Sequence, residues 1–144
     1  MQFNRGLASP YFTTNNQPLL LEDPYVLIYN QKITAMKDLI PILEQVARSG
    51  KTLVILCVDL DGEALATLLI NKMRGTLNAV AIKAPEYGDQ RKRMLEDIGV
   101  LTNGQLICDD FGTTLEDVTL DMLGQAKSIS VDTNSTLIVG YDNL

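Results

Sequence analysis

The chain has 144 residues, a formal net charge of −6 at neutral pH and no histidine. This length is enough for one domain with its own hydrophobic core and is short for two. The acidic balance argues against binding to nucleic acid, and the lack of His excludes the Ser-His-Asp and Cys-His arrangements that activate most catalytic nucleophiles.

Patterns typical of strands and of helices alternate along the chain. A β-rich run at residues 19–29 precedes a helical pattern at residues 36–49, which Gly50 ends. The apolar run 52–58 has the composition of a strand buried on both faces of a parallel sheet. The remaining predicted elements are a helix at 62–74, a strand at 79–83, a helix at 89–99, a strand at 105–108, a short helix at 119–126, and strands at 128–131 and 136–139.

Alternating strands and helices of this size imply βαβ crossovers. We therefore expect residues 1–144 to form one α/β domain, in which helices flank a mostly parallel sheet. Cys57 and Cys108 lie in apolar runs, so we expect buried, unpaired thiols and a reducing compartment. The sequence shows neither a run of about 18 apolar residues nor a charged leader followed by an apolar stretch, so we expect no membrane span and no signal peptide.

The predicted helix at 62–74 carries more apolar surface than a helix needs to cover a core. Its apolar side chains span about 240° of the circumference, whereas an arc of about 100° is enough for a core-facing helix. These side chains are Ala64, Leu65, Ala66, Leu68, Leu69, Ile70 and Met73. We expect the second apolar side to contact something other than the core.

The predicted helix at 36–49 has a similar excess of apolar side chains. Ile40 and Ala47 lie outside the core stripe and widen the whole apolar arc to about 160°. A third candidate is a loop-like segment that contains Leu7, Tyr11 and Phe12, and its aromatic residues are either core anchors or exposed binding groups. The leading hypothesis is an apolar groove between the two helices that binds an unfolded chain or an amphipathic partner segment.

A second hypothesis rests on Asp59 and Asp61, at the carboxyl end of the predicted strand 52–58. Two carboxylates there could hold Mg²⁺ in a small α/β phosphotransferase or hydrolase. Further acidic ligands and a phosphate-binding lysine are missing, so we favour Asp61 as an N-cap or first-turn acid of the next helix. The basic residues within 89–97 are flanked by acids, which indicates a solvated helix face.

Several segments, in order, resemble the apical domain of the group I chaperonins, the GroEL type. They are "MQFNRG", "SPYF", "GEALATLLINKMRG", "KAPEYGDQRKRMLEDIGVLTNG" and "LGQAKSISVD", and the resemblance runs nearly end to end. It implies a module of a double-ring folding machine that captures non-native polypeptide through an apolar groove. The module releases the polypeptide into a closed chamber when the co-chaperonin lid binds.

Matched position by position, the resemblance places the binding groove between the helices at 39–49 and 62–74, with help from segment 7–12. The implied contact residues for non-native polypeptide and for the mobile loop of a GroES-type co-chaperonin are Leu7, Ala8, Ser9, Tyr11, Phe12, Ile40, Leu43, Glu44, Leu65, Leu69, Ile70 and Asn71. The family's ATP site belongs to another domain, so the resemblance implies no cofactor, metal or enzymatic activity in these residues. Mg-ATP would act in the full-length protein, whose other subunits are further partners. The resemblance also implies a location in the bacterial cytoplasm or, as the second choice, in the mitochondrial matrix or plastid stroma.

The chain departs from the family pattern at four positions. The family usually has an aromatic and then a large aliphatic residue where Leu7 and Ala8 stand, and Asp where Asn4 stands. It usually has Gly in place of Glu86, a change that is costly only if the backbone there has a positive φ. These departures suggest a divergent or specialised paralogue, and those at Leu7 and Ala8 also allow a degenerate copy that retains the fold and binds little.

Overall fold

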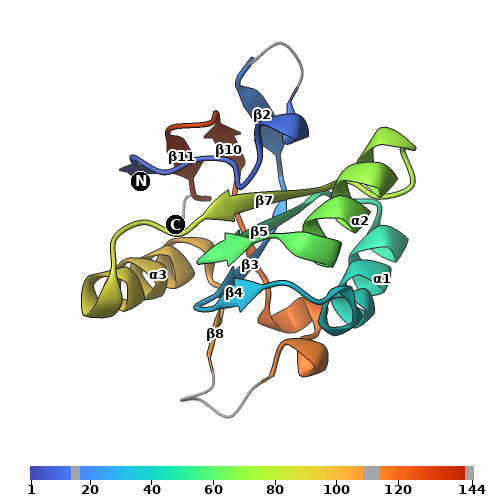
Figure 1. Ribbon diagram of the computed structural model, residues 1–144. Helices are drawn as coiled ribbons and strands as arrows, with labels where there is room; N and C mark the ends of the chain where they lie inside the picture. Colours follow the sequence, from blue (N-terminus) through green and yellow to red (C-terminus); the bar gives the residue numbers. More distant parts are fainter. Residues whose placement is uncertain (14–16, 109–113, 142–144) are drawn as a thin grey trace.

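The computed structural model describes residues 1–13, 17–108 and 114–141, and shows an α/β fold with two main sheets (Figure 1). One sheet has the strand order β7-β5-β3-β8, with β9 also paired to β3. Its strands are β3 (Tyr25–Tyr29), β5 (Leu53–Cys57), β7 (Ala79–Lys83), β8 (Leu106–Ile107) and β9 (Gly124–Gln125). All pairings in it are parallel except that of β9, which runs antiparallel to β3.

The helices follow from the parallel order of these strands. They are α1 (Ile40–Ser49), α2 (Gly62–Met73) and α3 (Gly88–Thr102). The chain steps in one direction through β3, β5 and β7, so right-handed crossovers place α1 and α2 on the same face of the sheet. The connection from β7 back to β8 reverses direction and places α3 on the other face. Figure 1 accordingly shows α1 and α2 together and α3 apart from them.

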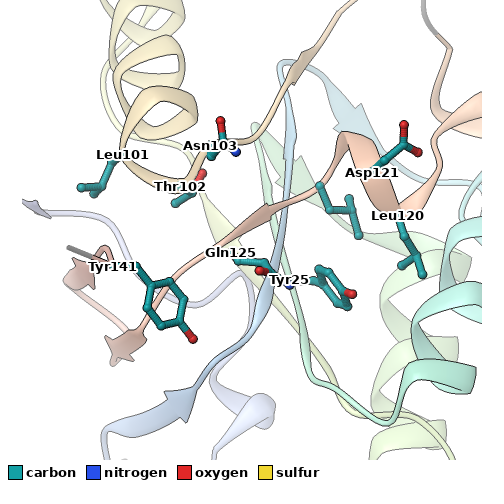
Figure 2. A pocket seen from close by; sticks show the side chains of 9 residues that line it. Tyr25, Leu101, Thr102, Asn103, Leu120, Asp121, Gln125 and Tyr141 are labelled. Atoms are coloured by element: carbon teal, nitrogen blue, oxygen red, sulfur yellow. The ribbon is translucent and has the colours of Figure 1, made fainter. Parts of the chain in front are cut away.

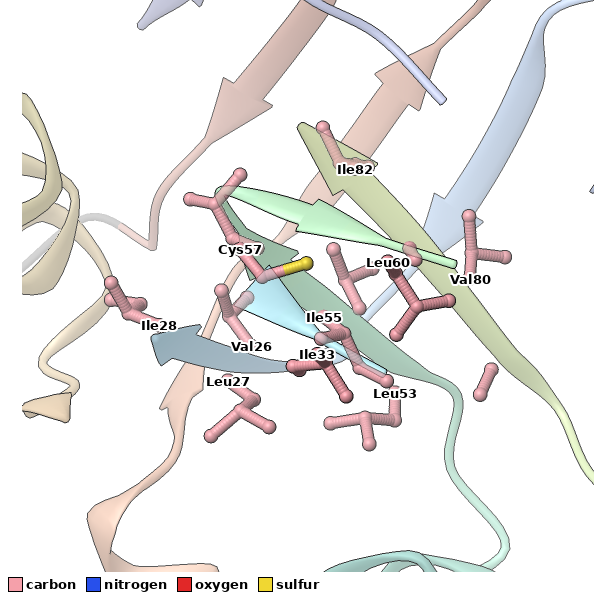
Figure 3. Packing of buried hydrophobic residues seen from close by; sticks show 14 of the residues in the cluster. Val26, Leu27, Ile28, Ile33, Leu53, Ile55, Cys57, Leu60, Val80 and Ile82 are labelled. Atoms are coloured by element: carbon pink, nitrogen blue, oxygen red, sulfur yellow. The ribbon is translucent and has the colours of Figure 1, made fainter. Parts of the chain in front are cut away.

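The core lies between this sheet and its helices. All five residues of β5 are buried, as expected for a central parallel strand with β-branched and leucine side chains. Figure 3 shows Val26, Ile55 and Val80 of three neighbouring strands among the apolar side chains packed there. Cys57 and Cys108 are buried and unpaired, which confirms the prediction for both thiols.

The second sheet is antiparallel, so the prediction of a mostly parallel sheet holds only for the first. Its order is β1-β11-β10-β2, formed by β1 (Gln2–Phe3), β2 (Leu19–Glu22), β10 (Ser128–Val131) and β11 (Thr136–Val139). The turn between β10 and β11 is too short for a parallel crossover. Asp132 fixes this turn by accepting hydrogen bonds from the backbone N–H groups of Asn134 and Ser135, at 2.7 and 2.8 Å.

The predicted elements differ from the structure in several places. The run 19–29 forms two strands in different sheets, which separate at Asp23, where φ is +51°. The helix predicted at 36–49 starts as a 3-10 turn, η2 (Met36–Asp38), and becomes α-helical at Ile40, because Pro41 fits the first turn of a helix. The predicted end of a helix at Gly99 is wrong: α3 continues to Thr102, and a Cβ at Gly99 would lie 3.0 Å from the Gly104 carbonyl oxygen.

The short helix predicted at 119–126 is also wrong. The chain there forms the 3-10 turn η5 (Leu120–Met122) and then β9, which pairs with β3. A Cβ at Gly124 would lie 2.3 Å from the Thr102 hydroxyl oxygen, so there is no space for a larger residue at this position. Another 3-10 turn, η4 (Leu115–Asp117), precedes η5, and η1 (Pro10–Phe12) follows the N-terminal strand.

A small parallel ladder joins β4 (Lys32–Ile33) to β6 (Asp59–Leu60). The N-terminal segment also runs beside β7, since Leu7 forms an antiparallel bridge with Ile82 and the Ala8 N–H donates to the Ala81 carbonyl at 2.9 Å. Among the described residues, no helix is both long and apolar enough to cross a membrane.

Candidate functional site

An open hollow of 390 Å³ lies between α1 and α2. Because both helices follow parallel strands of one sheet, they run in the same direction, and their facing sides form the two walls. The lining residues are Met36, Ile40, Leu43, Glu44, Ala47, Thr67, Asn71 and Leu77. Most of these side chains are apolar, and Glu44 is the only charged one.

The α1 wall divides its side chains between the core and the hollow. Ile42 and Val46 are buried against the sheet, and Leu43 is nearly buried while still lining the hollow. Ile40 leaves 44% of its surface exposed. Glu44 is exposed, and the Arg48 Nε donates to its backbone carbonyl oxygen at 3.3 Å.

Only a narrow part of the broad apolar arc on α2 is buried. Ala64 and Leu68 face the core, whereas Leu65 and Leu69 are partly buried against it. Ile70 and Met73 are exposed at 48% and 85%. Two large apolar side chains of α2 are therefore exposed outside the residues that line the hollow.

Asn71 sits where α2 gives way to the following loop and is held by several hydrogen bonds. Its side-chain Nδ2 donates to the Thr67 carbonyl oxygen at 2.8 Å, and the Thr76 hydroxyl lies 3.1 Å from its Oδ1. The backbone N–H groups of Thr76 and Leu77 both donate to the Asn71 carbonyl, at 3.1 and 3.3 Å. The Asn71 side chain therefore has only part of its hydrogen-bonding capacity left for a ligand.

Segment 7–12 is more buried than the loop-like pattern indicates. Leu7, Ser9 and Phe12 are buried, and Ala8 is partly buried. The Ser9 hydroxyl accepts a hydrogen bond from the Tyr11 N–H at 3.2 Å and caps η1. Tyr11 is the exposed member, at 79%. Of the two readings for the aromatics in this segment, Phe12 is a core anchor and Tyr11 is an exposed group.

The structure thus brings together one part of the predicted contact set. Ile40, Leu43, Glu44 and Asn71 line the same hollow. The other predicted residues do not line it: Leu65, Leu69 and Ile70 lie elsewhere on α2, and segment 7–12 lies beside β7.

Four lining residues were not among those predicted. Ala47 is one of the residues that widen the predicted apolar arc of its helix, and Thr67 could have been found because it precedes Asn71 by one helical turn on the same face. Met36 also lies one helical turn before Ile40 in the predicted helix 36–49, although the structure places it in η2. Leu77 lies in the loop after α2, and helical spacing gave no signal for it.

The two aspartates of the alternative hypothesis are held by neighbouring groups. Asp61 pairs with the Lys32 ammonium at 2.9 Å and accepts a hydrogen bond from the Thr34 hydroxyl at 3.1 Å. The hydrogen bond with Lys32 lowers the pKa of Asp61, and the same contact raises the pKa of Lys32. Asp61 occupies the N-cap position of α2, as predicted, but its side chain accepts no backbone N–H of the helix. Asp59 accepts a hydrogen bond from the Leu60 N–H at 2.8 Å.

Cys57 lacks the surroundings of a reactive thiol. Burial raises the pKa of Cys57 to about 12, which keeps the thiol protonated and weakly nucleophilic at neutral pH. Within residues 1–13, 17–108 and 114–141, no group of three or more His, Cys, Asp or Glu side chains is arranged to hold a metal ion.

A second hollow, of 460 Å³, lies near the end of α3 (Figure 2). Gln125 of β9 lies between Tyr25 and Tyr141 in this view, and Asn103 lies at the end of α3. The Tyr141 hydroxyl donates to Asp23, which also pairs with Lys51 at 3.0 Å. None of the predicted contact residues lies here. A comparison of the chain with known protein families found no family that matches it.

Proposed function

We propose that this chain is a polypeptide-binding module of the chaperonin apical type. The proposal rests on the sequence resemblance, and the structural observation that carries it is the apolar hollow between α1 and α2. In this proposal, non-native polypeptide segments bind in the hollow and along the exposed apolar side chains of the two helices. No residue acts as a catalyst.

The chemistry of the hollow suits a receptor for many unrelated segments. Burying apolar area stabilises a complex by about 25 cal/mol per Å² without demanding a particular sequence or direction. Ile40 in the hollow, and Ile70 and Met73 elsewhere on α2, offer such area before any ligand is bound. Glu44 and the remaining capacity of Asn71 supply polar contacts that select few side chains.

The burial of segment 7–12 narrows its role in the proposal. Tyr11 is the residue that we expect to contact a bound segment directly, because Leu7, Ser9 and Phe12 are buried. Their contribution would be to hold Tyr11 in place.

The wider assembly follows from the resemblance alone. We propose that the intact protein contains an ATP-hydrolysing domain, forms a double ring of identical subunits and uses a GroES-type lid. A ring would multiply the weak affinity of each groove through effective concentration, so that clients are held by several modules and released when the lid competes.

The proposal is tested by binding of a fluorescein-labelled amphipathic peptide, whose apolar residues recur at helical spacing, to the 144-residue chain. The variants are Ile40→Ser and Ile70→Ser, with Val100→Ser as control, because Val100 is 80% exposed on α3. Ile40→Ser and Ile70→Ser should each lose about three- to ten-fold in affinity, the expected effect of removing one half-exposed apolar side chain from the interface.

The control should bind like the parent, and thermal melting should show all variants folded. Saturable binding that Val100→Ser weakens as much as Ile40→Ser does would argue against this groove. A parent chain that binds no better to this peptide than to a scrambled peptide of the same composition would refute the proposed function itself.

A further inference from the structure

Leu77 forms a wall of the α1–α2 hollow although it belongs to the loop after α2. Its side chain is partly buried against the core and lines the hollow together with Ala47. The same two residues also line a smaller hollow of 140 Å³ near the carboxyl ends of both helices. Leu77 and Ala47 therefore separate the two spaces, and Leu77 has open space on both sides.

The loop that carries Leu77 is fastened to α2 through Thr76. The Thr76 hydroxyl lies 3.2 Å from the Asn71 carbonyl oxygen and 3.1 Å from its Oδ1, so its one hydrogen is shared between the two acceptors. With the two backbone bonds to the same carbonyl, this contact folds residues 76 and 77 back over the end of α2. The turn passes through Gly75, where φ is +73°.

We propose that Thr76 is a positioning residue for the groove: its hydroxyl, bonded to Asn71, keeps Leu77 in place as the groove wall and so sets the affinity for apolar segments. This inference rests on the proposed function. Thr76 does not line the α1–α2 hollow, so any effect on binding has to pass through Leu77 or Asn71. Without the hydroxyl, Leu77 has room to move toward the smaller hollow, and a bound segment loses one of its apolar contacts.

The test uses the labelled amphipathic peptide described above and the full chain with Thr76→Val, which keeps the β-branched shape and removes the hydroxyl. Because Thr76 is exposed and the backbone bonds remain, this variant should melt close to the parent. Its affinity should fall by about three- to ten-fold, which corresponds to the loss of one neutral hydrogen bond. Thr76→Ser, which retains the hydroxyl, should restore most of the affinity.

A double-mutant cycle distinguishes positioning from a general loss of stability. In a Leu77→Ala background, adding Thr76→Val should change the affinity by less than about two-fold, because the side chain that Thr76 positions is gone. An equal loss in both backgrounds would overturn the inference, as would unchanged binding by Thr76→Val or failure of Thr76→Ser to restore it. Each of these results leaves the proposed function standing, whereas a parent that shows no saturable binding refutes both.

Discussion

Glu86 adopts a backbone conformation that favours glycine, with φ of +64°. The family that the chain resembles usually has Gly at this position, so we expect Glu86 to cost stability if the φ there is positive. A non-glycine residue in the left-handed region costs about 1–2 kcal/mol of folding free energy. Replacing it with Gly recovers only part of this cost, because Gly has more conformational freedom to lose from the unfolded chain. Glu86→Gly should therefore raise the free energy of unfolding by about 0.5–1 kcal/mol, measured by urea denaturation.

The matched control is Gly88→Ala, two residues further on. Gly88 has a φ of +57° and a Cβ there would meet no atom within 4 Å, so the substitution adds backbone strain without a clash. It should lower the free energy of unfolding by about 1 kcal/mol. If Glu86→Gly proved neutral or destabilising while Gly88→Ala behaved as expected, the strain assigned to Glu86 would be wrong.

Asp132 makes the stability of the β10–β11 turn depend on pH. Hydrogen bonds from the backbone N–H groups of Asn134 and Ser135 lower its pKa below the ordinary value of 3.8. A carboxyl whose pKa is depressed by folding stabilises the native state above its unfolded pKa, and this stabilisation is lost as the pH falls through the folded pKa.

The prediction concerns Asp132→Asn, which keeps an oxygen acceptor and removes the charge. Its melting temperature should be below that of the parent at pH 7, and the difference should shrink as the pH falls below about 4, where the parent carboxyl protonates. Thermal melts monitored by circular dichroism across this range check it. A difference that stays constant with pH would show that the charge of Asp132 does not support the turn.

At the scale of single elements, α2 carries both core residues and exposed apolar residues along one helix. Leu68 is fully buried, whereas Met73 is 85% exposed. Leu68→Ala should destabilise the chain by about 2–5 kcal/mol through lost burial and a cavity, and Met73→Ala should change the free energy of unfolding by less than about 0.5 kcal/mol. Urea denaturation of both variants makes the comparison. A comparable cost at Met73 would mean that this end of α2 is part of the core.

Elements with strong local patterns were predicted closely from the sequence. The buried run of β5 and the strand β7 fall where their apolar composition indicates, and α2 begins at the predicted residue. The prediction failed where close packing overrides the local pattern. Gly99 packs against Gly104 in the turn that ends α3 and does not end the helix itself, and Gly124 packs against Thr102 inside a predicted helix. The contact between Gly124 and Thr102 cannot be read from neighbouring residues.

The candidate site shows the same limit. Helical spacing identified Ile40 and Leu43 on α1, and the resemblance added Glu44 and Asn71. Neither helical spacing nor the resemblance could reveal Leu77, whose position depends on a turn stabilised by side-chain hydrogen bonds. Nor could either of them show that Leu7 is buried, because that burial depends on pairing with Ile82, far along the chain.

At the scale of the whole molecule, segments that are distant in sequence pair with one another in the second sheet. The N-terminal strand β1 pairs with β11, and the Met1 ammonium donates to the Ile138 carbonyl at 2.8 Å. The second sheet is thereby tied to both ends of the described chain, while α1 and α2 lie on the first sheet. This arrangement leaves Ile40, Ile70 and Met73 exposed on the two helices without interrupting either sheet.

The most direct test of the central claim is to map the binding surface on the folded chain. Methyl and amide chemical shifts would be followed by NMR while the unlabelled amphipathic peptide is added. The account predicts saturable shifts at Ile40, Ala47, Asn71 and Leu77, with none at Tyr25 or Gln125 in the second hollow. Shifts that concentrate at the second hollow, or on α3, would contradict the assignment of peptide binding to the groove between α1 and α2.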